Sequence, residues 1–321
     1  MECGQRQLPL SIRAPTTREL QRFLNLFKSC ARYKLAVTTP VKSLKVAAVQ
    51  MKFRAAIAEN LESISSSIAK AARAKYDVIL FPECALTGYN IDFSNLNPIA
   101  IEVAIRAVVQ LARKNRINVI IGTPRVVKRK LFNSLIVIDR RGREIFQYDK
   151  IHLTARDTAV FEPGNRLAYF KIDRVPCTAI ICHERRFPEL VRLPVMMGAQ
   201  ILFHANAGLD SLAVSKTKRN GRDGITTRAF ENQIYYVFAN SVGPQGDNLW
   251  SAGDSKIVAP DMSLLAFANN RDETLIQATL DLSLAQRKYA RESLAQPAFL
   301  RPHWRALLAA CRKQLKRTEK H

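Results

Sequence analysis

The sequence predicts an α/β fold in which helices cover layered β-sheets. In the first half of the chain, short β-branched apolar runs alternate with longer segments of helical periodicity, which is typical of α/β proteins. In the second half, apolar runs follow one another closely across turn residues, as strands do in hairpins. The hydrophobic content of 47% is sufficient for a sizeable buried core.

Each element is expected from the period of its apolar residues. Strands are expected at residues 44–50, 77–81, 117–122, 178–182, 200–204, 235–240, 255–258, 264–267 and 275–279. Helices are expected at residues 55–75, 99–115, 187–198 and 222–233. Residues 131–139 and 144–148 predict a hairpin that turns at Arg140-Arg141-Gly142. We expect the run 178–182 to be the central strand.

The 321-residue chain is strongly basic, with a net charge of +23 that is concentrated at its two ends. Residues 1–44 hold eight Lys and Arg against Glu2 and Glu19, and residues 285–321 hold ten against Glu292 and Glu319. We therefore expect the basic termini to attract an anionic partner. No run reaches the roughly 18 apolar residues of a transmembrane segment.

Three regions follow from this pattern. Residues 1–43 form a basic N-terminal extension, residues 44–284 a central domain, and residues 285–321 a basic C-terminal extension. The six Cys are scattered without a CxxC pair, which favours a reducing, cytoplasmic compartment. The five His lie far apart, so we expect no metal site.

The N-terminal extension contains an expected amphipathic helix. Thr16 and Glu19 have the spacing of a capping box, and apolar residues recur at helical spacing from Leu20 to Ala31. Two interpretations stay open. The helix packs on the central domain or a second subunit, or it binds a membrane surface or a partner. A cleaved transit peptide also stays open.

The most informative stretch surrounds Cys182. The apolar run from Ala179 to Cys182 predicts a buried strand, and a charged turn and a new helix near Pro188 follow it. Ligands of α/β proteins bind at such carboxyl ends of strands, and a helix N-terminus favours a thiolate. The alternative is that Cys182 is a buried apolar residue, as many cysteines are.

Two other expected strands end in groups with useful chemistry. Glu83 follows the run 77–81, and Lys150 follows the run 146–148. With Cys182 they supply a base, an oxyanion stabiliser and a nucleophile. Taken one at a time, Glu83 is as consistent with a turn cap and Lys150 with a surface lysine.

The motifs around these residues resemble the nitrilase superfamily of carbon–nitrogen hydrolases in their order and separation. The resemblance runs from about Leu44 to about Leu282 and rests on Phe81-Pro-Glu83 with Leu86-Thr-Gly-Tyr89, Asp149-Lys-Ile-His-Leu153, Ile181-Cys-His-Glu-Arg-Arg-Phe-Pro-Glu189, Arg228-Ala-Phe-Glu-Asn232 with Tyr236-Val-Phe-Ala-Asn240, and Gly253-Asp-Ser-Lys-Ile257. It implies a four-layer α-β-β-α sandwich, a homodimer or larger homo-oligomer, and no cofactor.

The resemblance also implies a reaction. Cys182 attacks an amide or N-carbamoyl carbon of a small amide or ureido substrate and forms a thioester, with release of ammonia or an amine. Glu83 takes the thiol proton, and Lys150 stabilises the oxyanion together with the backbone N–H of His183.

Two further residues bear on substrate binding. Asp157 stands four residues before Phe161-Glu-Pro-Gly164, where the family often has a Glu, and is shorter by one methylene. Arg185 resembles an arginine that holds the substrate carboxylate in the N-carbamoyl-amino-acid amidohydrolase branch, and a guanidinium suits that task. The motifs are nearest to that branch and to the amidases.

Two alternatives stay open. The same triad also suits nitrile hydrolysis, although nitrilases usually carry Cys-Trp-Glu where this chain has Cys182-His183-Glu184. The chain is alternatively a catalytically weak hydrolase body that binds nucleic acid or a membrane through its basic ends.

Overall fold

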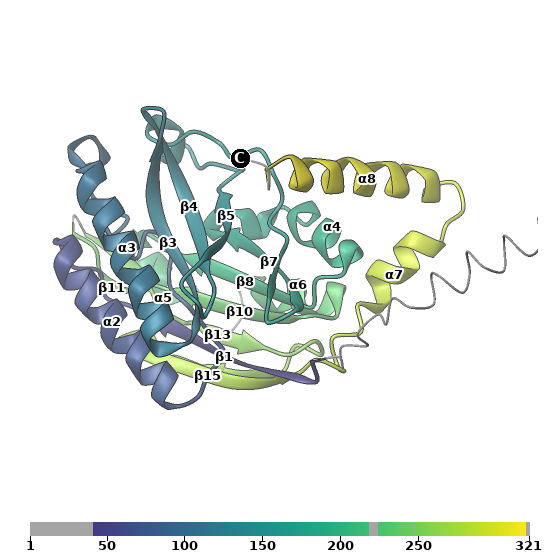
Figure 1. Ribbon diagram of the computed structural model, residues 1–321, viewed down its shortest axis with the longest axis horizontal. Coiled ribbons are helices and arrows are strands. Elements are labelled where there is room, and N and C mark those ends of the chain that lie inside the picture. Colours follow the sequence, from purple (N-terminus) through teal and green to yellow (C-terminus); the bar gives the residue numbers. More distant parts are fainter. Residues whose placement is uncertain (1–40, 218–223, 247, 319–321) are drawn as a thin grey trace, which may run out of the picture. The chain divides into compact units, whose positions relative to one another are not determined.

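The computed structural model describes residues 41–217, 224–246 and 248–318 (Figure 1). The amphipathic helix expected near residues 16–32 lies outside the described residues. Within the described ranges, no helix combines the length and the apolar composition that a membrane crossing needs.

The first of two six-stranded sheets is formed by the first strands of the domain and its last strand. β1, β2 and β3 pair in parallel, whereas β15, β4 and β5 pair antiparallel with their neighbours. The strand order is β15 (Thr274–Asp281), β1 (Ser43–Gln50), β2 (Val78–Leu80), β3 (Asn118–Val127), β4 (Lys130–Ile138) and β5 (Glu144–Asp149).

The second sheet has a parallel centre of β7, β8 and β10 with antiparallel edges. Its order is β14 (Leu264–Phe267), β13 (Lys256–Val258), β10 (Tyr235–Asn240), β8 (Ile201–Asn206), β7 (Val175–Ile181) and β6 (Phe170–Ile172). The prediction that the run 178–182 is the central strand is wrong. β7 lies second from the edge, because β8 and β10 occupy the centre and only the three-residue β6 lies outside it.

The fold has four layers, because the buried side chains form one core between the two sheets and one core between each sheet and its helices. Along β1, Val46 and Ala48 point into the core between the two sheets, while Ala47 and Val49 point to the helices on the outer face, as the two-residue period of a strand requires. The helices α2 (Ile57–Arg73) and α3 (Pro98–Asn115) cover the first sheet. The helices α4 (Glu189–Met197) and α6 (Ile225–Asn232) cover the second sheet. The predicted four-layer α-β-β-α sandwich is confirmed.

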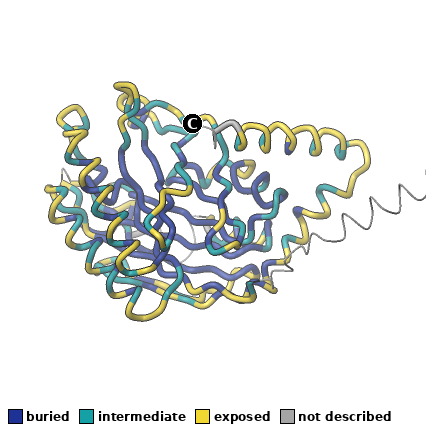
Figure 2. The backbone as a smooth tube through the Cα atoms, in the orientation of Figure 1, coloured by how far each residue is buried: buried dark blue, intermediate teal, exposed yellow. Residues whose placement is uncertain are grey.

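The helices begin and end where local chemistry dictates. The Asn97 side chain accepts hydrogen bonds from the first backbone N–H groups of α3, and Pro98 occupies its first position, where a missing N–H has no cost. α3 ends at Arg116 in a left-handed conformation. Figure 2 shows the inner strands buried and the outer faces of these helices exposed.

Two C-terminal helices add to the layer of α4. In α7 (Lys288–Ala295) and α8 (Arg301–Thr318), Ala290 and Leu308 are buried in the same core as α4, and Trp304 packs against it. A small third sheet contains β9 (Asp210–Ser211), β11 (Val242–Pro244) and β12 (Leu249–Ala252), and the short helix α5 spans Leu212–Thr217. These short strands were not expected from the sequence.

The two sheets bring several strand ends together. β2 leads into Glu83, β7 into Cys182 and β8 into Ala207. The β3 backbone lies very close to Glu83 at Gly122, where a Cβ atom would meet the Pro82 carbonyl oxygen at 2.2 Å and the Glu83 Cα at 2.6 Å. A side chain at position 122 would therefore displace the turn that holds Glu83.

Candidate active site

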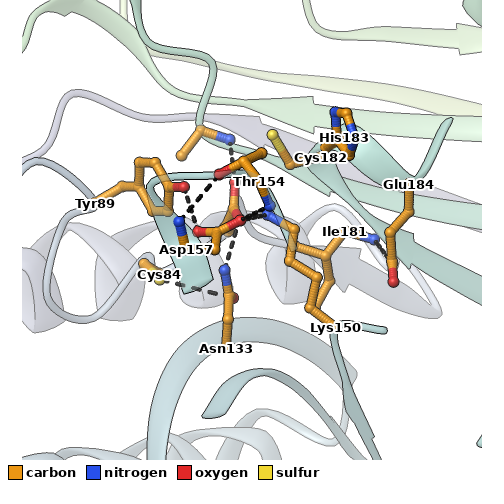
Figure 3. A network of polar contacts seen from close by, with 12 residues as sticks. Cys84, Tyr89, Asn133, Lys150, Thr154, Asp157, Ile181, Cys182, His183 and Glu184 are labelled. Carbon is orange, nitrogen blue, oxygen red and sulfur yellow. Dashed lines mark hydrogen bonds and ion pairs between the residues drawn. The ribbon is translucent and has the colours of Figure 1, made fainter. Parts of the chain in front are cut away.

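A buried cluster of ions joins the two sheets where these strands end (Figure 3). The Lys150 Nζ lies 2.8 Å from Glu83 Oε1 and 2.8 Å from Asp157 Oδ2. The exposed fractions of the Lys150 and Glu83 side chains are 0%, and that of Asp157 is 1%. Two carboxylates therefore face one ammonium in a site from which water is excluded, and this excess of negative charge suits the uptake of a proton.

Glu83 is held by both of its oxygens. Oε1 also accepts a hydrogen bond from Asn133 Nδ2 at 2.7 Å, and Oε2 accepts one from the Ala207 N–H at 3.0 Å. Asn133 lies on β4 and Ala207 follows β8, so each sheet contributes one donor. Because two of these three donors are neutral, the carboxylate is oriented without a second counter-ion.

Asp157 reaches Lys150 despite its short side chain. It lies on a single turn of 3₁₀ helix, η2 (Asp157–Ala159). Its Oδ1 accepts a hydrogen bond from the Tyr89 hydroxyl at 2.5 Å, and its Oδ2 accepts one from the Thr154 N–H at 3.0 Å. Burial acts to raise the pKa of Asp157, but the charge of Lys150 and these hydrogen bonds hold it below its usual value.

Lys150 stays charged in this environment. Burial alone would lower its pKa, but the facing charge of Glu83, followed by Cys182 and other neighbours, raises the pKa well above its usual value. The ammonium is therefore available to stabilise a developing oxyanion.

Cys182 begins a short 3₁₀ helix, η3 (Cys182–Arg186), directly after β7. Its φ of +51° lies in the left-handed region, which non-glycine residues rarely adopt outside functional turns. Burial and the charge of Glu83 raise the pKa of its thiol to about 12. A helix N-terminus favours a thiolate, but here burial and a neighbouring carboxylate outweigh the weak field of a single helical turn.

A histidine that the sequence analysis missed holds the Cys182 backbone. The His204 Nε2 lies 3.1 Å from the Cys182 carbonyl oxygen, and its Nδ1 lies 2.8 Å from the Tyr236 hydroxyl. Burial and the charge of Arg185 lower the pKa of His204 well below its usual value, so the ring is neutral. Nε2–H then donates to the carbonyl, and Tyr236 donates to Nδ1. The sequence signal that could have pointed to His204 was its position inside the apolar run that forms β8.

Glu184 was also missed, because it looked like one charge in a polar turn. It is fully buried, and its carboxylate accepts hydrogen bonds from the Ile151 N–H at 2.6 Å, the Ile181 N–H at 2.7 Å and the Tyr148 hydroxyl at 2.8 Å. Burial raises its pKa to about 7. Glu184 thus ties the segment after Lys150 to the end of β7.

A cavity of about 170 Å³ opens beside Cys182. His183 and Arg185 line it with the nucleophile candidate. Burial and the charge of Arg186, whose Nη1 lies 2.7 Å from His183 Nδ1, lower the pKa of His183. The other lining residues are Thr154, Arg186, Asn206, Gly208, Leu209, Asp210, Phe238, Asn240, Ala252, Gly253 and Asp254. Basic and acidic side chains thus line the same cavity.

Asp157 does not line this cavity. It borders a larger hollow of about 830 Å³ whose lining does not include Cys182. Glu83 and Lys150 are also absent from the lining of the smaller cavity, so the role of Asp157 is argued from its contact with Lys150, which suits holding the ammonium. In the described part of the chain, no group of three or more His, Cys, Asp or Glu is arranged to hold a metal ion.

Comparisons with known proteins show the family of this chain. Residues 45–289 match the family described as carbon-nitrogen hydrolase. The 2-oxoglutaramate amidase of Bacillus subtilis (strain 168) is 31% identical over 231 residues, covering 70% of this chain and 85% of that protein. A nitrilase of Pyrococcus abyssi is 29% identical over 252 residues, covering 76% of this chain and 92% of that protein.

Among solved structures, an amidase from Nesterenkonia sp. AN1 in complex with acrylamide has the same fold. Its TM-score is 0.71 at 21% identity, covering 84% of this chain and all of that one. The family match and the shared fold together establish that this chain belongs to the carbon-nitrogen hydrolase family of enzymes, in the nitrilase superfamily.

Proposed function

We propose that this chain hydrolyses the C–N bond of a small amide or ureido compound, with Cys182 as the nucleophile. The observation that carries the proposal is the buried Glu83–Lys150 ion pair next to a thiol that is protonated at rest. A protonated thiol needs a base, and the intermediate needs a fixed positive charge. The cavity of about 170 Å³ suits a small molecule.

In the acylation step, Glu83 takes the thiol proton as the sulfur attacks the carbonyl carbon. The developing oxyanion is stabilised by the Lys150 ammonium and by the backbone N–H of His183, in the first turn of η3 where helical N–H groups have no partner within the helix. Glu83 returns the proton to the nitrogen, the C–N bond breaks, and ammonia or an amine leaves the thioester.

In the second step, Glu83 takes a proton from water, which attacks the thioester carbon. The C–S bond breaks, the carboxylic acid leaves, and the Cys182 thiol regains a proton. Asp157 contacts Lys150 in both steps, so we assign it the positioning of the ammonium and not the binding of substrate.

The proposal is tested by ammonia release from a panel of amides, ureido acids and nitriles, which also decides between amide and nitrile hydrolysis. Cys182→Ala is expected to abolish turnover, and Glu83→Gln to lower kcat by about 10²–10⁴, the usual contribution of a general base. Cys177→Ala, on the strand β7 that leads to Cys182 but buried between the sheets, is the matched control and keeps turnover. Activity of Cys182→Ala, or a loss below tenfold in Glu83→Gln, contradicts the mechanism.

Arg185 is proposed to bind a carboxylate of the substrate, because its side chain lines the cavity three residues after Cys182 and a guanidinium binds carboxylates in pairs of hydrogen bonds. Arg185→Ala is expected to raise KM for carboxylate-bearing substrates about tenfold and to leave neutral amides nearly unchanged. Arg106→Ala, which removes an exposed charge on α3 away from the cavity, is the control. Equal effects of Arg185→Ala on charged and neutral substrates would make Arg185 structural.

A second proposal is that α8 attracts an acidic partner. Its inner side packs on α4 through Trp304 and Leu308, while Arg305, Arg312 and Lys316 are exposed at spacings that place them on one helical face. The predictions of a homo-oligomer and of a cytoplasmic location stay predictions.

Replacing Arg305, Arg312 and Lys316 by Gln is expected to lower the salt concentration that elutes the protein from heparin and to leave turnover unchanged. Salt weakens such attraction because the Debye length falls from about 10 Å at 0.1 M to about 3 Å at 1 M. The control replaces Lys70, Lys114 and Lys171, which are also exposed but lie on other elements. The proposal is wrong if both triple variants elute at the same salt concentration.

A further inference from the structure

Asn206 stands next to the proposed nucleophile. It is the last residue of β8, which pairs in parallel with β7 so that Ala205 faces Ile181. One residue further along both strands, Asn206 therefore lies beside Cys182, and both line the cavity. The exposed fraction of Asn206 is 6%, and its Oδ1 has no hydrogen-bond partner among the described residues.

The orientation of the Asn206 amide is fixed by its neighbours. The Gly253 carbonyl can only accept, so Asn240 turns its Nδ2 toward it at 2.7 Å. Asn240 Oδ1 then accepts from Asn206 Nδ2 at 2.8 Å and from the Gly208 N–H at 3.2 Å. A flipped Asn206 would place two acceptor oxygens together. Asn206 Oδ1 is therefore the one acceptor in this hydrogen-bonded pair of amides that has no donor among the described residues.

The free oxygen lies on the same side of the site as Glu83. The residue after Asn206, Ala207, donates its N–H to Glu83 Oε2 at 3.0 Å. A group bound between Asn206 and Cys182 is thus near the carboxylate that returns a proton to the leaving nitrogen. A buried carbonyl oxygen without a donor is unfavourable, and an N–H of the bound substrate would remove this cost.

We propose that Asn206 Oδ1 accepts a hydrogen bond from the nitrogen of the scissile amide or ureido group, which makes Asn206 a specificity-determining residue for substrates with an N–H. The inference rests on the proposed function. Asn206 exchanges no proton. It holds the nitrogen while the S–C bond forms and the C–N bond breaks. An ester presents an oxygen in place of the N–H, so its lone pairs would face Oδ1, and sites built to bind an N–H select against analogues that lack it.

The test compares a primary amide with the methyl ester of the same acyl group, because both acylate Cys182 through the same oxyanion. Asn206→Leu keeps the approximate volume and removes the acceptor. We expect kcat/KM for the amide to fall about 10- to 100-fold, as when one buried hydrogen bond is lost, while kcat/KM for the ester stays within about threefold. Unchanged ester hydrolysis also shows that the variant is folded.

Asn133→Leu is the matched control, because Asn133 holds Glu83 and its loss should lower both substrates together. An equal fall for amide and ester in Asn206→Leu at an unchanged melting temperature, or no fall in either, overturns the inference and makes Asn206 structural. If Asn206→Leu loses both activities and its melting temperature falls, the amide-to-ester ratio of the smaller Asn206→Ala decides by the same criteria. A wild-type chain that releases no ammonia from any amide or ureido compound instead overturns the proposed function and, with it, this inference.

Discussion

The buried ion pair between Lys150 and Glu83 is the constraint on which the rest of the site depends. Charges removed from water are stable only when partners and hydrogen bonds replace their hydration, and removal of one partner from such a pair destabilises a protein by about 3–5 kcal/mol. Here Asn133, the Ala207 N–H and Asp157 supply those partners. The pair therefore fixes β4 of the first sheet and the end of β8 of the second sheet relative to Glu83.

The backbone around this pair is fixed by groups that touch neither charge. Glu184 joins the Lys150 segment to the end of β7 through three donors. His204 is hydrogen-bonded to the carbonyl of Cys182, whose backbone is left-handed. Because Gly122 has no side chain, β3 can lie against the backbone of Glu83. These contacts fix the relative positions of base, ammonium and thiol before any substrate binds, which is what electrostatic catalysis requires.

Much of this was predictable from the sequence where the signal is local. Strongly apolar runs placed the main strands and helices, and each strand end carried one reactive group. The three-residue β6 and the strands of the small third sheet were missed, because a strand of two to four residues is too short to show an alternation of apolar and polar residues. Asn133 and Tyr89 were missed because their contacts, with Glu83 50 residues away and with Asp157 68 residues away, have no local signature. The raised pKa of the Cys182 thiol has no local signature either, since burial of Cys182 depends on the whole fold.

The central claim is that Cys182 carries the acyl group of the substrate as a thioester beside the Lys150–Glu83 pair. It is tested most directly by quenching the wild-type chain with acid during turnover of a cleavable amide and measuring the mass of the peptide that contains Cys182. The account predicts a mass increase equal to the acyl group, which hydroxylamine removes and which a Cys182→Ala chain does not show. Ammonia release without any adduct on that peptide, or an adduct on another residue, would contradict the account.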